Sequence, residues 1–155
     1  MSQTKQSLLS ELFENWCGEK VVSIVKLPAS GSPREYYRIH GPKMRAIGAI
    51  NHDRKENEAF LSFSKHFHAR GLAVPEIYLE DLDQHVYLQE DLGDLSLFDH
   101  VFQLRENGPF PPELVRMYKK VLTQLQRFQI SGSEGLDYAL CYPRSSFDRQ
   151  SMQWD

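Results

Sequence analysis

Large apolar residues recur along the chain in different patterns, and each pattern predicts a different kind of element. Near the N-terminus they return every three or four residues, which predicts an amphipathic helix on Leu8, Leu9, Leu12, Phe13 and Trp16. Three short runs rich in β-branched or aromatic residues follow, separated by turn residues, and predict an antiparallel meander of strands: VVSIVKL (21–27), EYYRIH (35–40) and MRAIGAI (44–50).

The period becomes helical again after Asp53, which is a favourable N-cap residue. Gly71 is a natural C-terminal stop, so the pattern predicts a helix over about residues 53–70. Two more strands, EIYLEDL and HVYLQEDL, follow and pair around a short turn, and beyond Gly93 the pattern is helical. One stripe of the helix over 53–70 carries Glu56, Phe60, Phe63 and Phe67, with Ala59 beside it.

The order of these elements predicts an α+β fold with a five-stranded antiparallel sheet and one helix crossing it. We place a boundary after residue 92: residues 1–92 form the sheet with its N-terminal helix, and residues 93–155 form further helices. The last residues, FDRQSMQWD, predict a helix start with Asp148 as N-cap. Because Met152 and Trp154 would have little to pack against, we expect a chain cut inside a larger fold; the alternative is a frayed tail.

Composition narrows the classes of function mainly by exclusion. The 155 residues carry a net charge of −3 with no block of like charges, which argues against nucleic acid or an anionic membrane as the main partner. Cys17 and Cys141 are isolated, so neither a disulfide framework nor a zinc site is expected. The polar N-terminus does not predict a signal peptide, and no apolar run is long enough to span a bilayer, so we expect a cytoplasmic protein.

The loop between the first two strands is the first candidate site. Ser30, Gly31 and Ser32 are small enough to let backbone N–H groups approach phosphate oxygens, and the two hydroxyls add donors. Arg34 could supply positive charge. The alternative is a solvated hairpin in which Gly31 adopts a positive φ.

Two further features extend the candidate site. Glu56 lies on an apolar stripe, where a carboxylate needs a cation or a hydrogen-bond donor from the neighbouring strands; alternatively it is an acid favoured by the helix dipole. The run YLQEDLGDLSL leads from a strand through Gln89, Glu90 and Leu92 into helices, as a hinge between two lobes would. The alternative is a plain strand-to-helix loop with Asp94 as N-cap; Ser96 is the second candidate for the cap of the helix that follows.

Taken in order, PASGSPREYYRI, AIGAINHDRKENEAF, GLAVPEIYLED and VYLQEDLGDLSL resemble the N-terminal lobe of the aminoglycoside phosphotransferase and choline kinase-like family. The resemblance spans about residues 20–130 and implies a protein-kinase-like fold with an incomplete C-terminal lobe. It implies ATP and Mg²⁺ as cofactors and a sugar or aminoglycoside-like hydroxyl as acceptor. It further implies that Ser30, Gly31 and Ser32 cover the phosphates, that Glu56 orients a phosphate-binding cation, and that Gln89, Glu90 and Leu92 line the adenine pocket.

The chain departs from this family pattern in two ways. The third strand, RAIGAIN, lacks the expected Lys, and three other cations are candidates for its place: Lys26, Lys43 and Arg45. No H-x-D motif is followed by Asn at the catalytic spacing, so the catalytic Asp, the Asn and the metal-binding Asp would lie beyond Asp155. We therefore assign no catalytic and no metal-binding residue.

Two functions from different classes follow from these features. The first is the ATP-binding part of a small-molecule phosphotransferase, inactive by itself. The second is a non-catalytic, kinase-derived module that binds a nucleotide or a protein, which the missing strand Lys favours. The sequence leaves the acceptor and the oligomeric state open.

Overall fold

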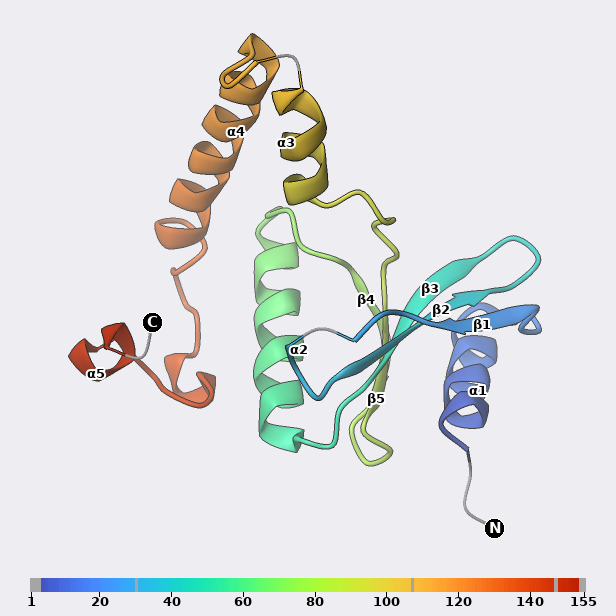
Figure 1. The fold of residues 1–155 in the computed structure, drawn as a ribbon. Helices are drawn as coiled ribbons and strands as arrows, with labels where there is room; N and C mark the ends of the chain where they lie inside the picture. The colour runs from blue at the N-terminus through green and yellow to red at the C-terminus, as the bar shows by residue number, and fades with distance from the viewer. Residues whose placement is uncertain (1–3, 30, 107, 147, 154–155) are drawn as a thin grey trace.

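The computed structural model describes residues 4–29, 31–106, 108–146 and 148–153, and its fold is α+β (Figure 1). Five strands form one sheet, and helices lie on both of its faces and beyond one edge. The elements in chain order are α1 (Lys5–Cys17), β1 (Ser23–Lys26), β2 (Glu35–His40), β3 (Arg45–Ile50), α2 (Arg54–Ala69), β4 (Ile77–Asp81), β5 (Val86–Gln89), α3 (Leu97–Arg105), α4 (Pro112–Gln129), a short 3₁₀ helix η1 (Tyr138–Leu140) and α5 (Arg149–Met152).

The sheet has the strand order β1-β2-β3-β5-β4, and every neighbouring pair is antiparallel. The chain leaves β3, passes through α2 and returns as the edge strand β4, so the last strand β5 inserts between β3 and β4. This connection places Ile47 of β3 directly opposite Gln89 of β5. The predicted five-stranded antiparallel sheet is confirmed.

Alternating side chains give the sheet two buried faces. Helix α1 packs its Leu9 and Phe13 on one face, against a cluster that includes Ile39 and Leu88. Helix α2 covers part of the other face, where Leu61 packs with Ala49 and Tyr87. The two helices therefore lie on opposite sides of the sheet (Figure 1). The face under α2 is only partly covered by helix, and the candidate site lies in its remaining part.

Local capping explains where the helices begin and end. The Asp53 side chain accepts a hydrogen bond from the Glu56 backbone N–H at 3.1 Å and so starts α2, as predicted. Gly18 and Gly71 follow α1 and α2 with φ of 73° and 65°, a left-handed conformation that glycine adopts at little cost. Helix α3 is capped by Ser96, whose hydroxyl accepts from the Asp99 N–H at 3.0 Å.

The buried stripe of α2 differs from the predicted one. The predicted stripe ran through Glu56, Phe60 and Phe67, and these side chains are only half-buried. Asn57 is buried because its Nδ2 atom donates to the Asn51 carbonyl at 2.7 Å, a contact that the hydrophobic pattern could not reveal. The residues of α2 that are buried are Asn57, Ala59, Leu61 and Ser64.

The chain after α4 runs back along α2, and we call residues 130–143 the return segment. The Phe67 ring of α2 meets Phe128 of α4 at a centroid distance of 5.1 Å. The ring Nε2 atom of His66 lies 2.8 Å from the Gly132 carbonyl oxygen. Near the other end of α2, the Tyr142 hydroxyl donates to Asp53 Oδ2 at 2.7 Å. The return segment therefore contacts α2 from its last turns to its N-cap.

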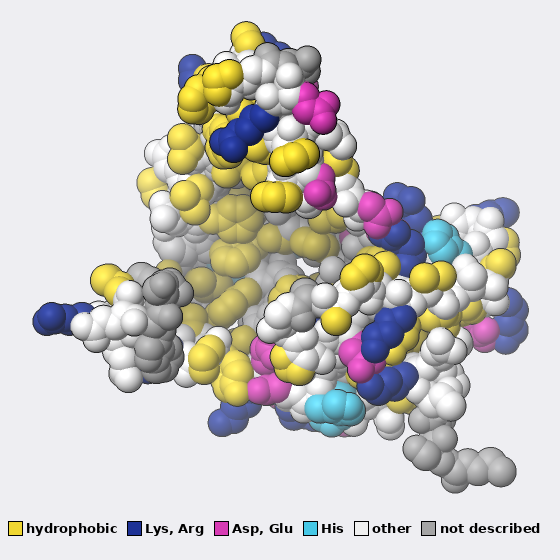
Figure 2. Space-filling view, in the orientation of Figure 1, with side chains coloured by type: hydrophobic (Ala, Val, Ile, Leu, Met, Phe, Trp, Pro, Cys, Tyr) yellow, Lys and Arg dark blue, Asp and Glu magenta, His cyan; other side chains and the backbone are white. Residues whose placement is uncertain are grey.

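Helices α3 and α4 form a hairpin that projects away from the sheet (Figure 1). Figure 2 shows hydrophobic side chains gathered on this hairpin and in the hollow between it and the rest of the molecule. Within the described residues, no helix combines the length and the apolar character needed to cross a membrane. The exposed apolar side chains of the hairpin include Phe98, Phe102, Tyr118, Val121, Leu122 and Leu125.

Candidate functional site

The loop between β1 and β2 contains the residues that the sequence predicted to contact phosphate. The Leu27 N–H donates to the Tyr36 carbonyl at 2.9 Å, which closes the base of the loop. Near its tip, Ser32 Oγ accepts a hydrogen bond from the Arg34 N–H at 3.2 Å. Gly31 and Ser32 are exposed, whereas the predicted phosphate contact Ser30 lies outside the described residues. The Ser32 side chain therefore stabilises the turn near the tip of this loop.

Arg34 leaves this loop and forms an ion pair with Glu56 of α2. Its Nη2 atom lies 2.8 Å from Glu56 Oε1. The second carboxylate oxygen of Glu56 accepts from Asn51 Nδ2, also at 2.8 Å. The Arg34 side chain is 8% exposed and that of Glu56 33% exposed, so the pair is partly withdrawn from solvent. The sequence predicted that Glu56 needs such a cation, and this expectation is confirmed.

Aromatic rings hold the Arg34 guanidinium in place. The Arg34 Cζ atom lies 4.9 Å from the centre of the Phe60 ring and 5.9 Å from that of Tyr87. Contacts of this kind are attractive because the ring face is electron-rich. Arg34 Nη1 also donates to the Tyr36 hydroxyl at 3.4 Å. Burial raises the pKa of Tyr87, so its phenol stays neutral next to the ion pair.

The other cations proposed for this place bind elsewhere. Lys26 Nζ lies 3.4 Å from Glu35, on a different part of the sheet. Arg45 Nε lies 3.8 Å from Asp91 Oδ2. Lys43 lies in the turn before β3, where its backbone N–H donates to the Glu19 carboxylate at 3.0 Å. Among the four candidate cations, Arg34 is therefore the one that pairs with Glu56.

A second ion-pair cluster ties β2 to the segment after β5, and sequence reasoning missed it. Arg38 Nε lies 2.9 Å from Asp91 Oδ2, and Arg38 Nη2 lies 2.8 Å from Asp94 Oδ1. The Asp91 side chain is only 1% exposed, and its Oδ1 also accepts from the Gly93 N–H at 3.0 Å. Hydrogen bonds from Arg38 lower the pKa of Asp94.

These contacts correct the alternative interpretation of Asp94. Asp94 and Ser96 were the two expected N-caps of the following helix; the Asp94 carboxylate binds Arg38, and Ser96 takes the cap. One sequence signal could have pointed to the cluster. Arg38 lies two residues after Tyr36 in the same strand, so both side chains point to the same face of the sheet. A cation that is buried on such a face requires an acidic partner.

A pocket opens between the sheet face and the segment that leaves β5, and we call it the strand-exit pocket. Its volume is about 330 Å³. It brings together the predicted residues Gln89, Glu90 and Leu92. Arg34 and Glu56 do not line it, but Arg34 is joined to it through the hydroxyl of Tyr36. The lining consists of Leu27, Tyr36, Arg38 and Ile47 together with residues 89–94.

The lining gives this pocket a mixed chemistry. Leu27, Ile47 and Leu92 offer apolar surface to a flat ligand, and the segment after β5 offers peptide groups and the Gln89 carboxamide along one edge. The charged side chains of Arg38, Glu90, Asp91 and Asp94 supply much of the remaining lining, so the pocket is polar as well as apolar. Gly31 and Ser32 are not among its described lining residues, so their predicted role at phosphates has no counterpart in the pocket itself.

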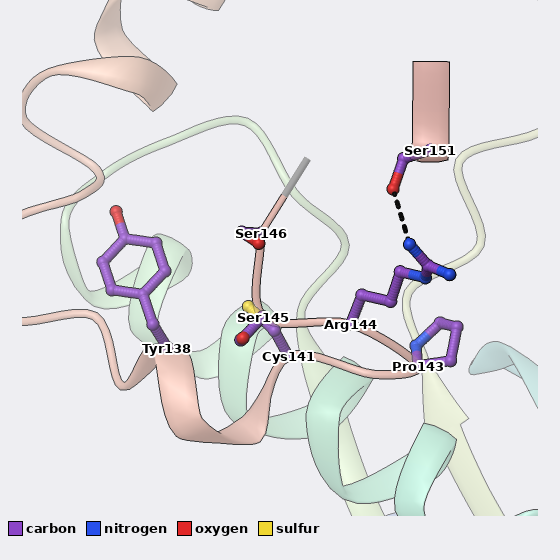
Figure 3. A pocket seen from close by; sticks show the side chains of 7 residues that line it. All are labelled: Tyr138, Cys141, Pro143, Arg144, Ser145, Ser146 and Ser151. Atoms are coloured by element: carbon purple, nitrogen blue, oxygen red, sulfur yellow. Dashed lines mark hydrogen bonds between the residues drawn. The ribbon is translucent and has the colours of Figure 1, made fainter. Parts of the chain in front are cut away.

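A larger pocket of about 410 Å³ lies near the C-terminal end of the described chain (Figure 3). Its lining includes Tyr138, Cys141 and Arg144, and Arg144 Nη1 lies 3.5 Å from Ser151 Oγ. None of the candidate site residues from the sequence analysis lines it, so we assign it no role. In the described part of the chain, no three His, Cys, Asp or Glu side chains are placed to hold a metal ion.

Neither a protein-family model nor a curated protein sequence matches the chain. The resemblance to the aminoglycoside phosphotransferase and choline kinase-like family therefore stays a prediction from its motifs.

Proposed function

We propose that this chain is the nucleotide-binding part of a small-molecule phosphotransferase of the aminoglycoside phosphotransferase and choline kinase-like type. The complete enzyme would pass the γ-phosphoryl group of ATP to a hydroxyl of a sugar or aminoglycoside-like acceptor. The observation that carries this proposal is the strand-exit pocket, in which Leu27 at the start of the loop meets Gln89, Glu90 and Leu92 at the end of the sheet.

The pocket suits the base end of a nucleotide. Its volume of about 330 Å³ is at the lower end of the range for small-molecule sites, so it would hold part of a nucleotide rather than all of it. Apolar side chains from the sheet would contact the flat face of the base. The backbone of residues 90–92 would meet its polar edge. The phosphates would then extend toward the loop at residues 28–34.

The Arg34–Glu56 ion pair supports the phosphate end of this proposal. In protein-kinase-like enzymes a strand Lys paired with a helix Glu must be in place before phosphoryl transfer. Here the paired cation is Arg34, which comes from the loop itself. Because Arg34 is 8% exposed and bound by Glu56, we assign it the task of holding the loop against α2 rather than that of a free phosphate ligand.

The chemistry of transfer is not assigned to this chain. When bound, Mg²⁺ would neutralise phosphate charge, but the described residues include no cluster that could hold it, and the 155 residues contain no H-x-D motif with a following Asn at the catalytic spacing. We therefore expect these 155 residues to bind ATP without phosphorylating an acceptor. Phosphorylation of a sugar by this chain alone would contradict that expectation.

Thermal unfolding with and without ATP and Mg²⁺ tests the proposal. A ligand at one hundred times its Kd stabilises the folded state by about 2.7 kcal/mol, which is a rise in Tm of roughly 5–10 °C for a chain of this size. Leu92→Arg puts a charged side chain into the pocket and should abolish the rise. Leu95→Arg is the matched control, because Leu95 is 65% exposed against 67% for Leu92 and does not line the pocket. No rise for the wild type, or the same rise for Leu92→Arg, would refute the proposal.

A second candidate function is a non-catalytic module that binds a protein partner. The exposed apolar side chains of the α3–α4 hairpin favour it, since apolar patches of this kind mark interaction surfaces. Reading the coding DNA past the codon for Asp155 separates the two functions. A continuation that encodes H-x-D-x₄-N supports the enzyme, and a stop codon supports the module.

A further inference from the structure

Gln89 combines a polar side chain with a position at the inner edge of the strand-exit pocket. It is the last residue of β5, opposite Ile47 of β3 and next to Ile77 of β4. Side chains alternate along a strand, so Gln89 points to the same face as Tyr87, the face that carries α2 and the pocket. Both Gln89 and Ile47 line the pocket. The Gln89 carboxamide therefore lies beside the apolar residues Ile47 and Ile77, at the inner edge of the pocket, where the edge of a flat ligand would lie.

The Gln89 oxygen is buried and has no hydrogen-bond donor among the described residues. An unpaired buried acceptor is costly, and a ligand that brings an N–H group to it recovers that cost. The neighbouring acids are already engaged: Glu90 Oε2 accepts from the Glu76 N–H at 3.3 Å, and Asp91 is paired with Arg38. Gln89 Oε1 is thus a buried side-chain acceptor of this pocket to which the described residues bring no donor.

We propose that Gln89 selects the base of the bound nucleotide, and this inference rests on the proposed nucleotide-binding function. Adenine carries an exocyclic amine, a donor that matches the Gln89 Oε1 acceptor, whereas hypoxanthine and guanine carry a carbonyl oxygen at the same position. Two acceptors facing each other repel. The pocket therefore takes 6-aminopurine nucleotides in preference to 6-oxopurine nucleotides.

Calorimetric titration of the 155-residue chain with ATP and with ITP, each with Mg²⁺, tests this selection. The two nucleotides differ at the 6-position of the purine and at the adjacent N1, which carries a hydrogen in hypoxanthine but not in adenine. The ratio of their affinities therefore reports on this edge of the base, and the Gln89 variants isolate the contribution of the carboxamide. We expect the wild type to bind ATP roughly tenfold or more tightly than ITP, the size of discrimination that one well-placed amide contact provides. Gln89→Leu and Gln89→Met remove the acceptor and should bring the ratio close to one.

Ile47→Val is the matched control, since Ile47 lies opposite Gln89 in the same pocket and has no polar group. It should change both affinities by the same factor and leave the ratio intact. If Gln89→Leu fails to fold, as judged by circular dichroism, the longer Gln89→Met variant gives the answer.

The outcomes separate this inference from the function beneath it. If the wild type binds neither ATP nor ITP, the proposed function itself fails. If both nucleotides bind the wild type equally, or if the preference for ATP persists in Gln89→Leu and Gln89→Met, the nucleotide pocket stands and base selection by Gln89 is overturned.

Discussion

Arg34 and Glu56 join the loop before β2 to the first turn of α2: Arg34 Nη2 lies 2.8 Å from Glu56 Oε1, although the two residues are 22 positions apart in the sequence. The pair fixes two elements that the chain connects only through β2 and β3. The Arg34 guanidinium also lies over the Phe60 ring, so the ion pair and the aromatic contact both hold the loop against α2.

Removing this cation should destabilise the fold. Arg34→Met leaves Glu56 with the hydrogen bond from Asn51 but without its charge partner, so we expect the free energy of unfolding to fall by about 1–3 kcal/mol. Urea denaturation measures the loss. A double-mutant cycle with Glu56→Gln should return a coupling energy of at least about 0.5 kcal/mol.

Arg54→Met is the control for this cycle. Arg54 also lies on α2 and pairs with Glu58 and with Asp83, each at 2.9 Å, but all of these side chains are about half exposed or more. Exposed i,i+4 pairs contribute only about 0.3–0.5 kcal/mol. If Arg54→Met lowers the free energy of unfolding as much as Arg34→Met does, the Arg34–Glu56 pair stabilises the fold no more than an exposed pair.

Glu35 should make the stability depend on acid pH. The hydrogen bond from Lys5, followed by that from Tyr37, lowers the pKa of Glu35 from 4.5 to about 2 in the folded chain. The unfolded chain therefore binds the proton more readily, so Glu35 stabilises the fold above about pH 4.5 and loses this contribution as the pH falls toward 2. Urea denaturation at pH 6, 4 and 3 should give a shallower pH dependence for Glu35→Gln than for the wild type. Equal slopes would contradict the assignment.

The return segment should hold the N-terminal end of α2. The Tyr142 hydroxyl donates to Asp53 Oδ2 at 2.7 Å, while Asp53 Oδ1 caps the helix at the Glu56 N–H. Tyr142→Phe removes one hydrogen bond, and we expect a loss of about 0.5–1 kcal/mol together with faster hydrogen exchange in the first turn of α2. Tyr138→Phe, in the same segment, is the control and should leave that exchange unchanged. Equal exchange in both variants would show that Tyr142 does not brace α2.

Gly48 should tolerate no side chain, whereas Gly31 should. A Cβ atom at Gly48 would lie 2.8 Å from Leu9 Cδ2 and 2.9 Å from Ile39 Cδ1, and both side chains are fully buried and have little room to move. We expect Gly48→Ala to cost about 1–3 kcal/mol, the usual cost of overpacking. At Gly31 no atom of the described residues beyond its chain neighbours lies within 4 Å of such a Cβ, so Gly31→Ala should change the free energy of unfolding little. Chemical denaturation of both variants checks the contrast, and similar losses would contradict it.

Local patterns predicted most of the fold. The hydrophobic periods identified the five strands and the helices, and capping residues such as Asp53 and Gly71 marked the ends of α2, because a period and a cap depend only on residues near in sequence. The pattern failed on the inner face of α2, where a polar residue, Asn57, is buried through a hydrogen bond to the Asn51 backbone.

The sequence by itself determined which residue types were present for a site: a carboxylate on a helix, several cations near it, and a polar segment at the end of the last strand. Only the tertiary structure decided that Arg34, rather than Lys26, Lys43 or Arg45, meets Glu56. It also decided that Arg38 meets Asp91, 53 positions away. The reason is physical: strand register and the packing of α2 on the sheet set which side chains face each other, and neither is encoded in the spacing of residues along one element.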